Sequence, residues 1–386
     1  MAKSELGQNI KGGADIAPVD MILRNRIIDT LRKKFEQYGY LPLETASLNY
    51  LSLLTYKYEK DAEILAEIYK LRDQGDRDLG LRYDLTVPFC KYIAGNQNVK
   101  MPFKRYEIGK VWRNGPVKSG RAREFYQCDA DAVGIEGAHI EAEMVALAIE
   151  AFLELGIDPI IKYNSRKLLP QNDAIFSIID RIDKVTQDET LRDLCHHMPH
   201  AEAEKMLDDL KNGRVTKNIE IIEFEKAVVE LGIDKYCVFT PSLVRGQNYY
   251  TGMVFEGYHK QQGVTCSICG GGRYDNIIGN FIDNGQKYPA VGIGFGFEPI
   301  ITLLKNTGAG EKISAVDLML IPLGTESWCQ NYATKLRKKG QKILVYLGGK
   351  TIGKAIEYAA SYAIKRVAVI GQDEVGGKEI TIKEIN

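Results

Sequence analysis

Two long strand-like runs lie close together in the sequence, FKRYEIGKVWR at 103–113 and REFYQCDADAVG at 123–134. The segment between them, NGPVKSGRA, carries the glycine, proline, serine and asparagine that are typical of a loop. Two such runs joined by one loop predict an antiparallel hairpin. This part of the chain is therefore expected to build an antiparallel sheet, around which the other segments must pack.

The segments around this hairpin follow helical and strand patterns in turn. Apolar residues recur every four positions over 21–38, which predicts a helix that Gly39 ends. Shorter helical stretches are expected at 61–72 and 139–155, and LGLRYDLT at 79–86 reads as a strand leading into a helix. Residues 165–235 carry helix formers and no strand signal, so they predict a helical insertion. Strand patterns then resume, ending in the alternating glycines of AVGIGFGF at 290–297.

The C-terminal part of the chain has a different organisation. NTGAGEKIS at 306–314 reads as a linker. Beyond it, strands alternate with helical stretches, which indicates a small α/β domain with a largely parallel sheet. We therefore expect a domain at 1–305 with its insertion at about 165–235, a linker at 306–314 and a second domain at 315–386.

The overall charge gives no indication of a partner, because 51 Lys and Arg residues balance 51 Asp and Glu residues. An anionic ligand would have to be bound by a local patch, such as 104–123 with seven basic residues, although the same run could be a solvated charged hairpin. No apolar run is long enough to span a membrane, and the polar N-terminal segment has no signal core. We expect a cytoplasmic protein without a membrane partner.

Two short patterns of cysteine and histidine could in principle form a metal or redox site. Seven cysteines fit a reduced compartment. Cys266 and Cys269 form a single CxxC without a second one, and a pair buried in a strand explains them better. The run CHHMPH at 195–200 is interrupted by Pro199, and its adjacent residues would point away from each other on a helix. We predict no metal site built by the protein alone.

Several motifs together resemble the histidyl-tRNA synthetases, which are class II aminoacyl-tRNA synthetases. They are LRYDLTVPF (81–89), KRYEIGKVWR (104–113), GRAREFYQCDADAVG (120–134), LVRGQNYYTGMVFE (243–256) and CGGGRYD (269–275). The resemblance implies an α+β fold, with a class II catalytic domain built on an antiparallel sheet and a C-terminal anticodon-binding-like domain. It further implies ATP and Mg²⁺ as cofactors, histidine and tRNA(His) as substrates, and a homodimer.

The resemblance also assigns the residues that would bind ATP. Arg113 matches the arginine that grips the α-phosphate, and Arg245 matches an arginine on the opposite side of it. A guanidinium suits this task, because negative charge accumulates on the phosphate during amino-acid activation. Four more residues are expected around ATP: Arg121, Arg123, Phe125 and Gly296. Phe125 would stack on adenine, and the arginines would face phosphates or the tRNA acceptor end.

Histidine recognition requires partners for an ammonium group and for an imidazole ring. Asp84 and Thr86 are one strand period apart, so we expect both side chains to point the same way. By resemblance they hold the α-amino group, with Gln127 nearby. The resemblance places Asp131 on the imidazole N–H, and Gln127 and Asp131 share a strand face. Further expected pocket residues are Tyr249, Tyr250 and Tyr274, and Gly270 to Gly272 would let the backbone approach the ligand.

The sequence departs from the family pattern at three positions. Pro299 fits the first turn of a helix, but the family has there an arginine that covers adenine and reaches the γ-phosphate. Asn248 replaces an aspartate, and Ala46 replaces a proline of motif 1. The C-terminal domain also looks shorter than its relatives. A catalytically weakened paralog that binds histidine or tRNA as a regulator or sensor is therefore the alternative to a working ligase.

Overall fold

The computed structural model describes residues 7–56, 63–96, 98–117, 122–245, 249–260, 267–308, 314–349 and 351–385. The chain divides into two compact units. The first contains the N-terminal residues up to Ala14 together with Ile28–Leu303, and the second contains Asp15–Ile27 together with Leu304 onward. None of the described helices combines the length and apolar character needed to cross a lipid bilayer.

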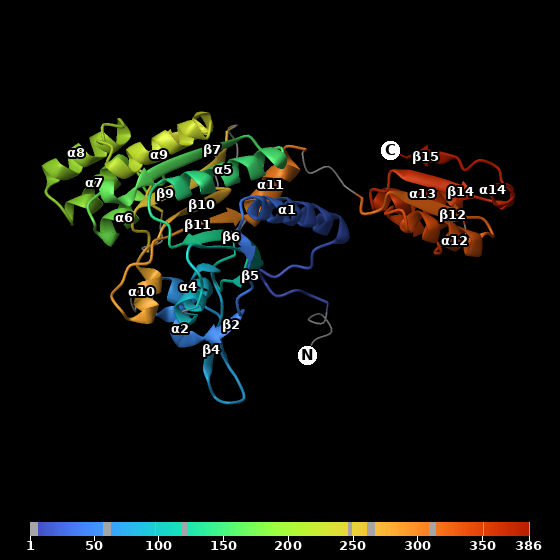
Figure 1. Cartoon of the computed structure of the whole chain (residues 1–386), viewed down its shortest axis with the longest axis horizontal. Helices are drawn as coiled ribbons and strands as arrows, with labels where there is room; N and C mark the ends of the chain where they lie inside the picture. Colours follow the sequence, from blue (N-terminus) through green and yellow to red (C-terminus); the bar gives the residue numbers. More distant parts are fainter. Residues whose placement is uncertain are drawn as a thin grey trace. The chain divides into compact units, whose positions relative to one another are not determined.

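An eight-stranded sheet forms the centre of the first unit (Figure 1). Its order is β1 (Leu41–Pro42), β5 (Phe103–Trp112), β6 (Glu124–Val133), β11 (Ala290–Gly296), β10 (Cys269–Arg273), β9 (Met253–His259), β7 (Pro159–Ser165) and β8 (Cys237–Phe239). The predicted hairpin is confirmed, because β5 and β6 pair antiparallel from Phe103 opposite Val133 to Trp112 opposite Glu124. Among the described strands of this sheet, only the two edge pairings, β1–β5 and β7–β8, are parallel.

Two long helices cover one face of this sheet, α1 (Pro18–Gln37) and α5 (His139–Glu154). The Phe35 ring of α1 lies 5.3 Å from Tyr106 and 5.7 Å from Phe295, and Phe152 of α5 lies 5.5 Å from Phe295. These contacts explain the apolar four-residue spacing of α1, whose core positions turn towards the sheet. The other face of the same strands is left for polar residues.

A three-stranded sheet lies beside the hairpin: β2 (Leu48–Tyr50), β4 (Asp78–Leu81) and β3 (Lys70–Arg72). The helix predicted over 61–72 is only partly correct, since α3 covers Glu63–Glu67 and β3 follows it. The cause is a turn at Asp73, whose Oδ1 accepts hydrogen bonds from the backbone N–H groups of Gly75 and Arg77 at 3.0 Å each. This turn folds Lys70–Arg72 back onto β4. Three helices accompany the sheet: α2 (Leu51–Thr55), α4 (Thr86–Gly95) and α10 (Ile277–Ile282).

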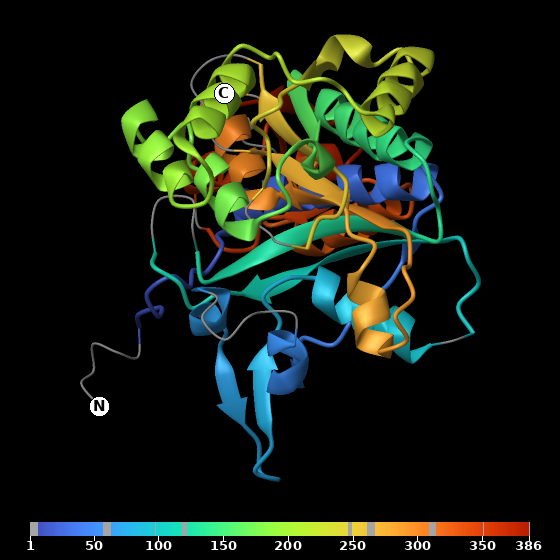
Figure 2. The ribbon, with the colours of Figure 1, turned by 90° about the vertical axis from the view of Figure 1, so that its left-hand side faces the viewer.

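The predicted helical insertion is present in the structure (Figure 2). It contains α6 (Asp173–Ile179), α7 (Gln187–Cys195), α8 (His200–Lys211) and α9 (Ile219–Glu230), with short 3₁₀ turns at Arg166–Leu168 and Asp234–Tyr236. Thr186 starts α7 with a capping box to Glu189. Leu194, Leu207 and Leu210 contribute to a core cluster that α6, α7 and α8 share, whereas Phe224 of α9 packs against Tyr163 of β7.

The C-terminal part of the second unit alternates strands and helices: β12 (Leu318–Pro322), α12 (Glu326–Arg337), β13 (Ile343–Val345), α13 (Ile352–Ser361), β14 (Arg366–Ile370), α14 (Gln372–Val375) and β15 (Ile382–Glu384). The strand order is β13–β12–β14–β15, and β12 is parallel to both of its neighbours. The largely parallel sheet is thus confirmed, with β15 added antiparallel to β14. Residues 309–313 of the predicted linker lie outside the described residues, and the domain boundaries stay a prediction.

Candidate functional site

The sheet face opposite α1 and α5 carries a polar row facing a glycine row. On β6 the row consists of Gln127, Asp129 and Asp131, whose spacing of two places them on one face. Their cross-strand partners on β11 are Gly296, Gly294 and Gly292 respectively. A Cβ atom on Gly294 would lie 2.9 Å from Oδ1 of Asp129, and one on Gly292 would overlap the Asp131 carboxylate. The alternating glycines therefore leave room for the carboxylates of the neighbouring strand.

The glycine surface continues on β10, where Gly270 pairs with Gly294. A Cβ atom on Gly270 would overlap the guanidinium of Arg245. We predicted that Gly270 to Gly272 admit a ligand close to the backbone. In the structure the space above Gly270 holds an arginine side chain of the protein itself.

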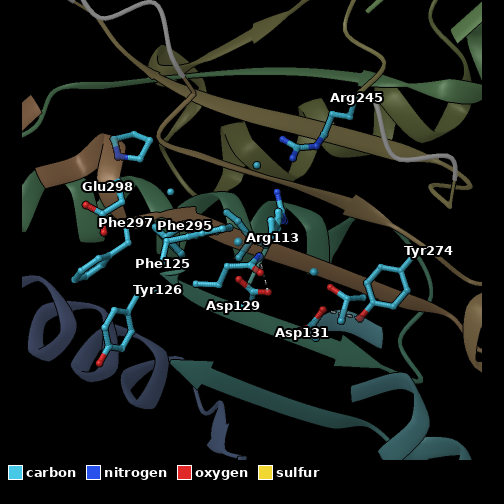
Figure 3. A pocket seen from close by; sticks show the side chains of 18 of the residues that line it. Arg113, Phe125, Tyr126, Asp129, Asp131, Arg245, Tyr274, Phe295, Phe297 and Glu298 are labelled. Atoms are coloured by element: carbon cyan, nitrogen blue, oxygen red, sulfur yellow. Dashed lines mark hydrogen bonds between the residues drawn. The ribbon is translucent and has the colours of Figure 1, made fainter. Parts of the chain in front are cut away.

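A cavity of about 310 Å³ lies over this floor (Figure 3). That volume is at the lower end of the range usual for small-molecule sites. Its lining brings together ten of the predicted site residues: Thr86, Arg113, Phe125, Gln127, Asp131, Arg245, Tyr249, Tyr250, Tyr274 and Gly296. Segments that are distant in the sequence thus line the same cavity.

Two arginines reach the cavity from different elements. Arg113 follows β5; its Nε donates to the backbone carbonyl of Tyr83 at 3.1 Å, and its guanidinium lies 5.1 Å from the Phe125 ring centre. Arg245 has a φ of 57°, unusual for a residue with a side chain, and its Nη1 donates to Glu256 Oε1 at 2.9 Å. Burial opposes the charge of Arg245, but Tyr250 and Glu256 outweigh it and raise its pKa. Both guanidinium groups thus have partners within the protein that position them at the cavity.

Asp131 is held by two side chains. Tyr274 Oη donates to Oδ1 at 2.5 Å, and Arg105 Nη2 lies 2.7 Å from Oδ2. Burial raises the pKa of Asp131, and Arg105 counteracts that shift. Arg105 is completely buried and was not predicted as a site residue. The pairing register of the hairpin could have indicated this residue, because it places Arg105 directly opposite Asp131.

Asp129 is a second site residue that the sequence reasoning missed. It is 4% exposed and lines the cavity. Gln127 Nε2 donates to its Oδ2 at 3.5 Å, and its buried Oδ1 has no hydrogen-bond partner among the described residues. Burial raises the pKa of the Asp129 carboxyl well above its usual range; Arg105 opposes the shift, and Asp131, Asp84 and Glu107 add to it. Its place midway between Gln127 and Asp131, two residues from each on the same strand face, could have indicated it.

The prediction that Asp84 and Thr86 share a strand face is wrong. The strand β4 ends at Leu81, and α4 begins at Thr86. Asp84 Oδ1 accepts a hydrogen bond from the backbone N–H of Val87 at 2.9 Å, as a helix-capping side chain does. Thr86 lines the cavity, whereas Asp84 is not among its lining residues. The role of Asp84 towards the α-amino group stays a prediction.

The remaining ATP-site predictions have different outcomes. Arg123 is not among the lining residues; its Nε donates to the Gly115 carbonyl at 3.4 Å. Phe125 lines the cavity, and the Arg113 guanidinium lies over its ring. Arg121 lies outside the described residues, as do Asn248 and Cys266.

Pro299 occupies the first turn of α11 (Phe297–Asn306), as the local rules predict. It lines the cavity together with Glu298, and a Cβ on Gly296 would lie 3.2 Å from its Cγ. The position where the resemblance expects an arginine is therefore part of the site. Among the described residues, no group of three or more His, Cys, Asp or Glu side chains is arranged to hold a metal ion.

Comparison with known families and structures gives an independent result. The model of the family described as "Histidyl-tRNA synthetase" matches residues 12–300. The chain belongs to the histidyl-tRNA synthetase family. The model described as "Anticodon binding domain" matches residues 317–386, in the second unit. Both matches confirm the resemblance drawn from the motifs.

Relatives in the histidyl-tRNA synthetase family match over nearly the whole chain. "Histidine--tRNA ligase 1" of Bacillus thuringiensis subsp. konkukian is 40% identical, covering 98% of this chain and 95% of the relative. "Histidine--tRNA ligase 2" of Shouchella clausii is 37% identical, covering 98% and 96%. The crystal structure of histidyl-tRNA synthetase from Nostoc sp. PCC 7120 superposes with a TM-score of 0.84 at 25% identity, covering 98% of this chain and 94% of that one.

Proposed function

We propose that this protein is a histidine–tRNA ligase, which activates histidine with ATP and transfers it to tRNA(His). The observation that carries the proposal is the single cavity that holds Arg113 and Arg245 together with Gln127, Asp131 and Tyr274. Phosphate-binding cations and groups suited to histidine thus share one site. The family and its named relatives support the same activity.

The first step joins histidine to AMP. An oxygen of the histidine carboxylate attacks the α-phosphorus of ATP, and pyrophosphate leaves. Negative charge accumulates around that phosphorus, and Arg113 and Arg245 stabilise it without having to move into place. In the second step the 2′- or 3′-hydroxyl of the terminal tRNA adenosine attacks the histidyl carbonyl, and AMP leaves.

Asp131 recognises the imidazole in this proposal. Its Oδ1 already accepts from Tyr274 and its Oδ2 faces Arg105, so its position is fixed from two sides. Each carboxylate oxygen can accept more than one hydrogen bond. A fixed buried carboxylate therefore selects a ring with an N–H donor over apolar rings, which would leave its remaining acceptor sites without a donor. Thr86 and Gln127 lie in the same cavity and contact the amino-acid backbone.

Mg²⁺ fits this site as an ion bound mainly by the nucleotide. It usually keeps several waters and takes one or two carboxylates plus substrate phosphates. Glu298 is a carboxylate in the lining and would hold it. When bound, Mg²⁺ supplies positive charge to the outer phosphates.

A homodimer is part of the proposal, as the family resemblance implies. The small sheet and its surroundings expose large apolar side chains, with Leu48 47%, Tyr50 57% and Leu41 58% exposed. Such a surface is typical of a protein interface. The six described cysteines are free thiols, which supports a reducing cytoplasm as the place of action.

The test is histidine-dependent exchange of pyrophosphate into ATP, followed by charging of tRNA(His). The wild-type protein should catalyse both, and Arg113→Ala should lower the exchange rate on the order of 100- to 1000-fold. Arg192→Ala, on the exposed side of α7, serves as the control and should leave the rate unchanged. If histidine binds but no exchange occurs at high protein concentration, the ligase proposal fails and a histidine-binding regulator replaces it.

A further inference from the structure

A group of buried charged side chains beside the cavity contains two ion pairs and Asp129. Arg82 pairs with Glu107 at 2.6 Å, and Arg105 pairs with Asp131 at 2.7 Å. Asp129 lies between these two pairs on the sheet, because the register places it opposite Glu107 and two residues from Asp131. Among the described residues, no Lys, Arg or His side chain forms an ion pair with it. No described residue supplies a cation paired with Asp129.

The hydrogen bonds of Asp129 are equally incomplete. Its Oδ2 has one long contact of 3.5 Å to Gln127, and its Oδ1 is buried without a partner among the described residues. Gly294 on the next strand leaves open space beside that oxygen. Burying a carboxylate in this way is costly unless a cationic donor reaches it. Asp129 lines the cavity, so a ligand cation can be that donor.

The position of Asp129 along β6 indicates which part of the ligand its carboxylate would contact. Side chains two residues apart on a strand are separated by roughly 6.5–7 Å, so Asp129 and Asp131 can contact different parts of one amino acid. Asp131 and Tyr274 mark the imidazole end, while Arg113 follows the opposite end of the β5–β6 hairpin, beyond Gln127. On β6, Asp129 lies between Gln127 and Asp131. The group between imidazole and carboxylate in histidine is the α-carbon with its ammonium.

We propose that Asp129 binds the α-ammonium of the amino-acid substrate, together with Thr86 and Gln127. The inference rests on the proposed function, because it takes the orientation of histidine from the ATP and imidazole ends of the site. It adds a specificity-determining residue outside the set that the motifs indicate. Asp84, which the resemblance assigns to the same ammonium, already caps α4 through its Oδ1.

The test compares Asp129→Asn with the wild type for three ligands. Asn keeps the shape and a contact to Gln127 but removes the charge. Histidine and histidinol carry the ammonium, whereas imidazole-4-propionate lacks it. Calorimetric titration should show that Asp129→Asn weakens histidine and histidinol binding on the order of 10- to 100-fold. Binding of imidazole-4-propionate should stay unchanged.

Other roles of Asp129 predict other patterns. An equal loss of affinity for all three ligands would place Asp129 at the imidazole. A loss of affinity confined to ATP–Mg²⁺ would make it a residue that binds the metal or the nucleotide. Either outcome overturns the proposal, and so does an unchanged affinity for every ligand. Asp76→Asn removes the same charge from an exposed turn and is the matched control. The melting temperature without ligand should not fall in Asp129→Asn, which separates lost binding from misfolding. These titrations need no catalysis, so a wild type that binds histidine without exchange refutes the ligase function and still tests Asp129.

Discussion

At the scale of single residues, Pro299 leads to a prediction about ATP binding. It lines the cavity at the start of α11, where the family resemblance expects a cation. Pro299→Arg should therefore raise kcat/KM for ATP in histidine-dependent exchange, on the order of 10-fold or more, because one further cation would face the phosphates.

The matched control for Pro299→Arg is Thr302→Arg, which adds the same charge to an exposed position of the same helix. It should leave the exchange kinetics unchanged. If Pro299→Arg gives no gain in kcat/KM for ATP, an arginine at this position is not what limits the enzyme.

The raised pKa of Asp129 predicts how the free energy of unfolding depends on pH. Its pKa in the folded protein is raised above the unfolded value of about 3.9 by burial, with Asp131, Asp84 and Glu107 adding and Arg105 opposing. Between the two pKa values the folded protein holds a proton that the unfolded chain has released. The contribution of Asp129 to the free energy of unfolding therefore decreases as pH rises above about 4.

Denaturant unfolding of wild type and Asp129→Asn from pH 4 to pH 8 measures this effect. The two proteins should be similar near pH 4, and the variant should become the more stable one as pH rises. Saturating histidine should reduce the difference. A constant difference across the range would show that Asp129 does not titrate in this way.

The sequence identified some site residues and missed others for a physical reason. Arg113, Arg245 and Asp131 lie within contiguous motifs, and all three line the cavity. Arg105 and Asp129 can be recognised as site residues only from the pairing of β5 with β6 and from their burial. A charged residue in a strand is usually exposed, so local patterns alone do not distinguish these two.

At the scale of elements, the glycine surface of β10 and β11 determines where Arg245 lies. Gly270→Ala would force the Arg245 guanidinium away, since the added Cβ would overlap it. We expect the exchange rate to drop on the order of 100-fold, while far-UV circular dichroism stays that of the wild type. Gly95→Ala is the control, because nothing lies within 4 Å of a Cβ there. Full activity of Gly270→Ala would mean that the position of Arg245 is unimportant.

Elements were predictable where period and turn residues agreed. The β5–β6 hairpin, α1, α5 and the helical insertion follow from such patterns. The pattern failed over 70–72 and 84–86. In both places an aspartate side chain bonds to backbone N–H groups and reverses or starts an element. Those bonds depend on a fold geometry that periodicity does not contain.

At the scale of the whole molecule, the homodimer can be tested through the exposed apolar surface of β2. Leu48→Lys introduces a charge at a side chain that is 47% exposed. Light scattering after size exclusion should show a shift from dimer to monomer, because burying an unpaired charge is costly. Val229→Lys, at the 61% exposed surface of α9, should remain dimeric. A wild type that is monomeric at micromolar concentration would refute the proposed dimer.

The whole-molecule architecture came from motif resemblance rather than from composition. The balanced charge and ordinary apolar content exclude few classes of soluble protein fold. Five motifs in order predicted the fold, because each occupies a defined place in the sheet or its connections. The strand order β6–β11–β10–β9 joins segments more than 100 residues apart, and pairing over such distances cannot be read from local patterns.

The glycine floor also restricts how this site can be redesigned. Glycine has no side chain, so substitution at positions 270, 292 and 294 can only fill space and cannot create it. A larger amino acid thus cannot be admitted by trimming the floor. Any widening of the substrate range has to come from the β6 row or from the tyrosines, which are the same groups that we propose to bind histidine.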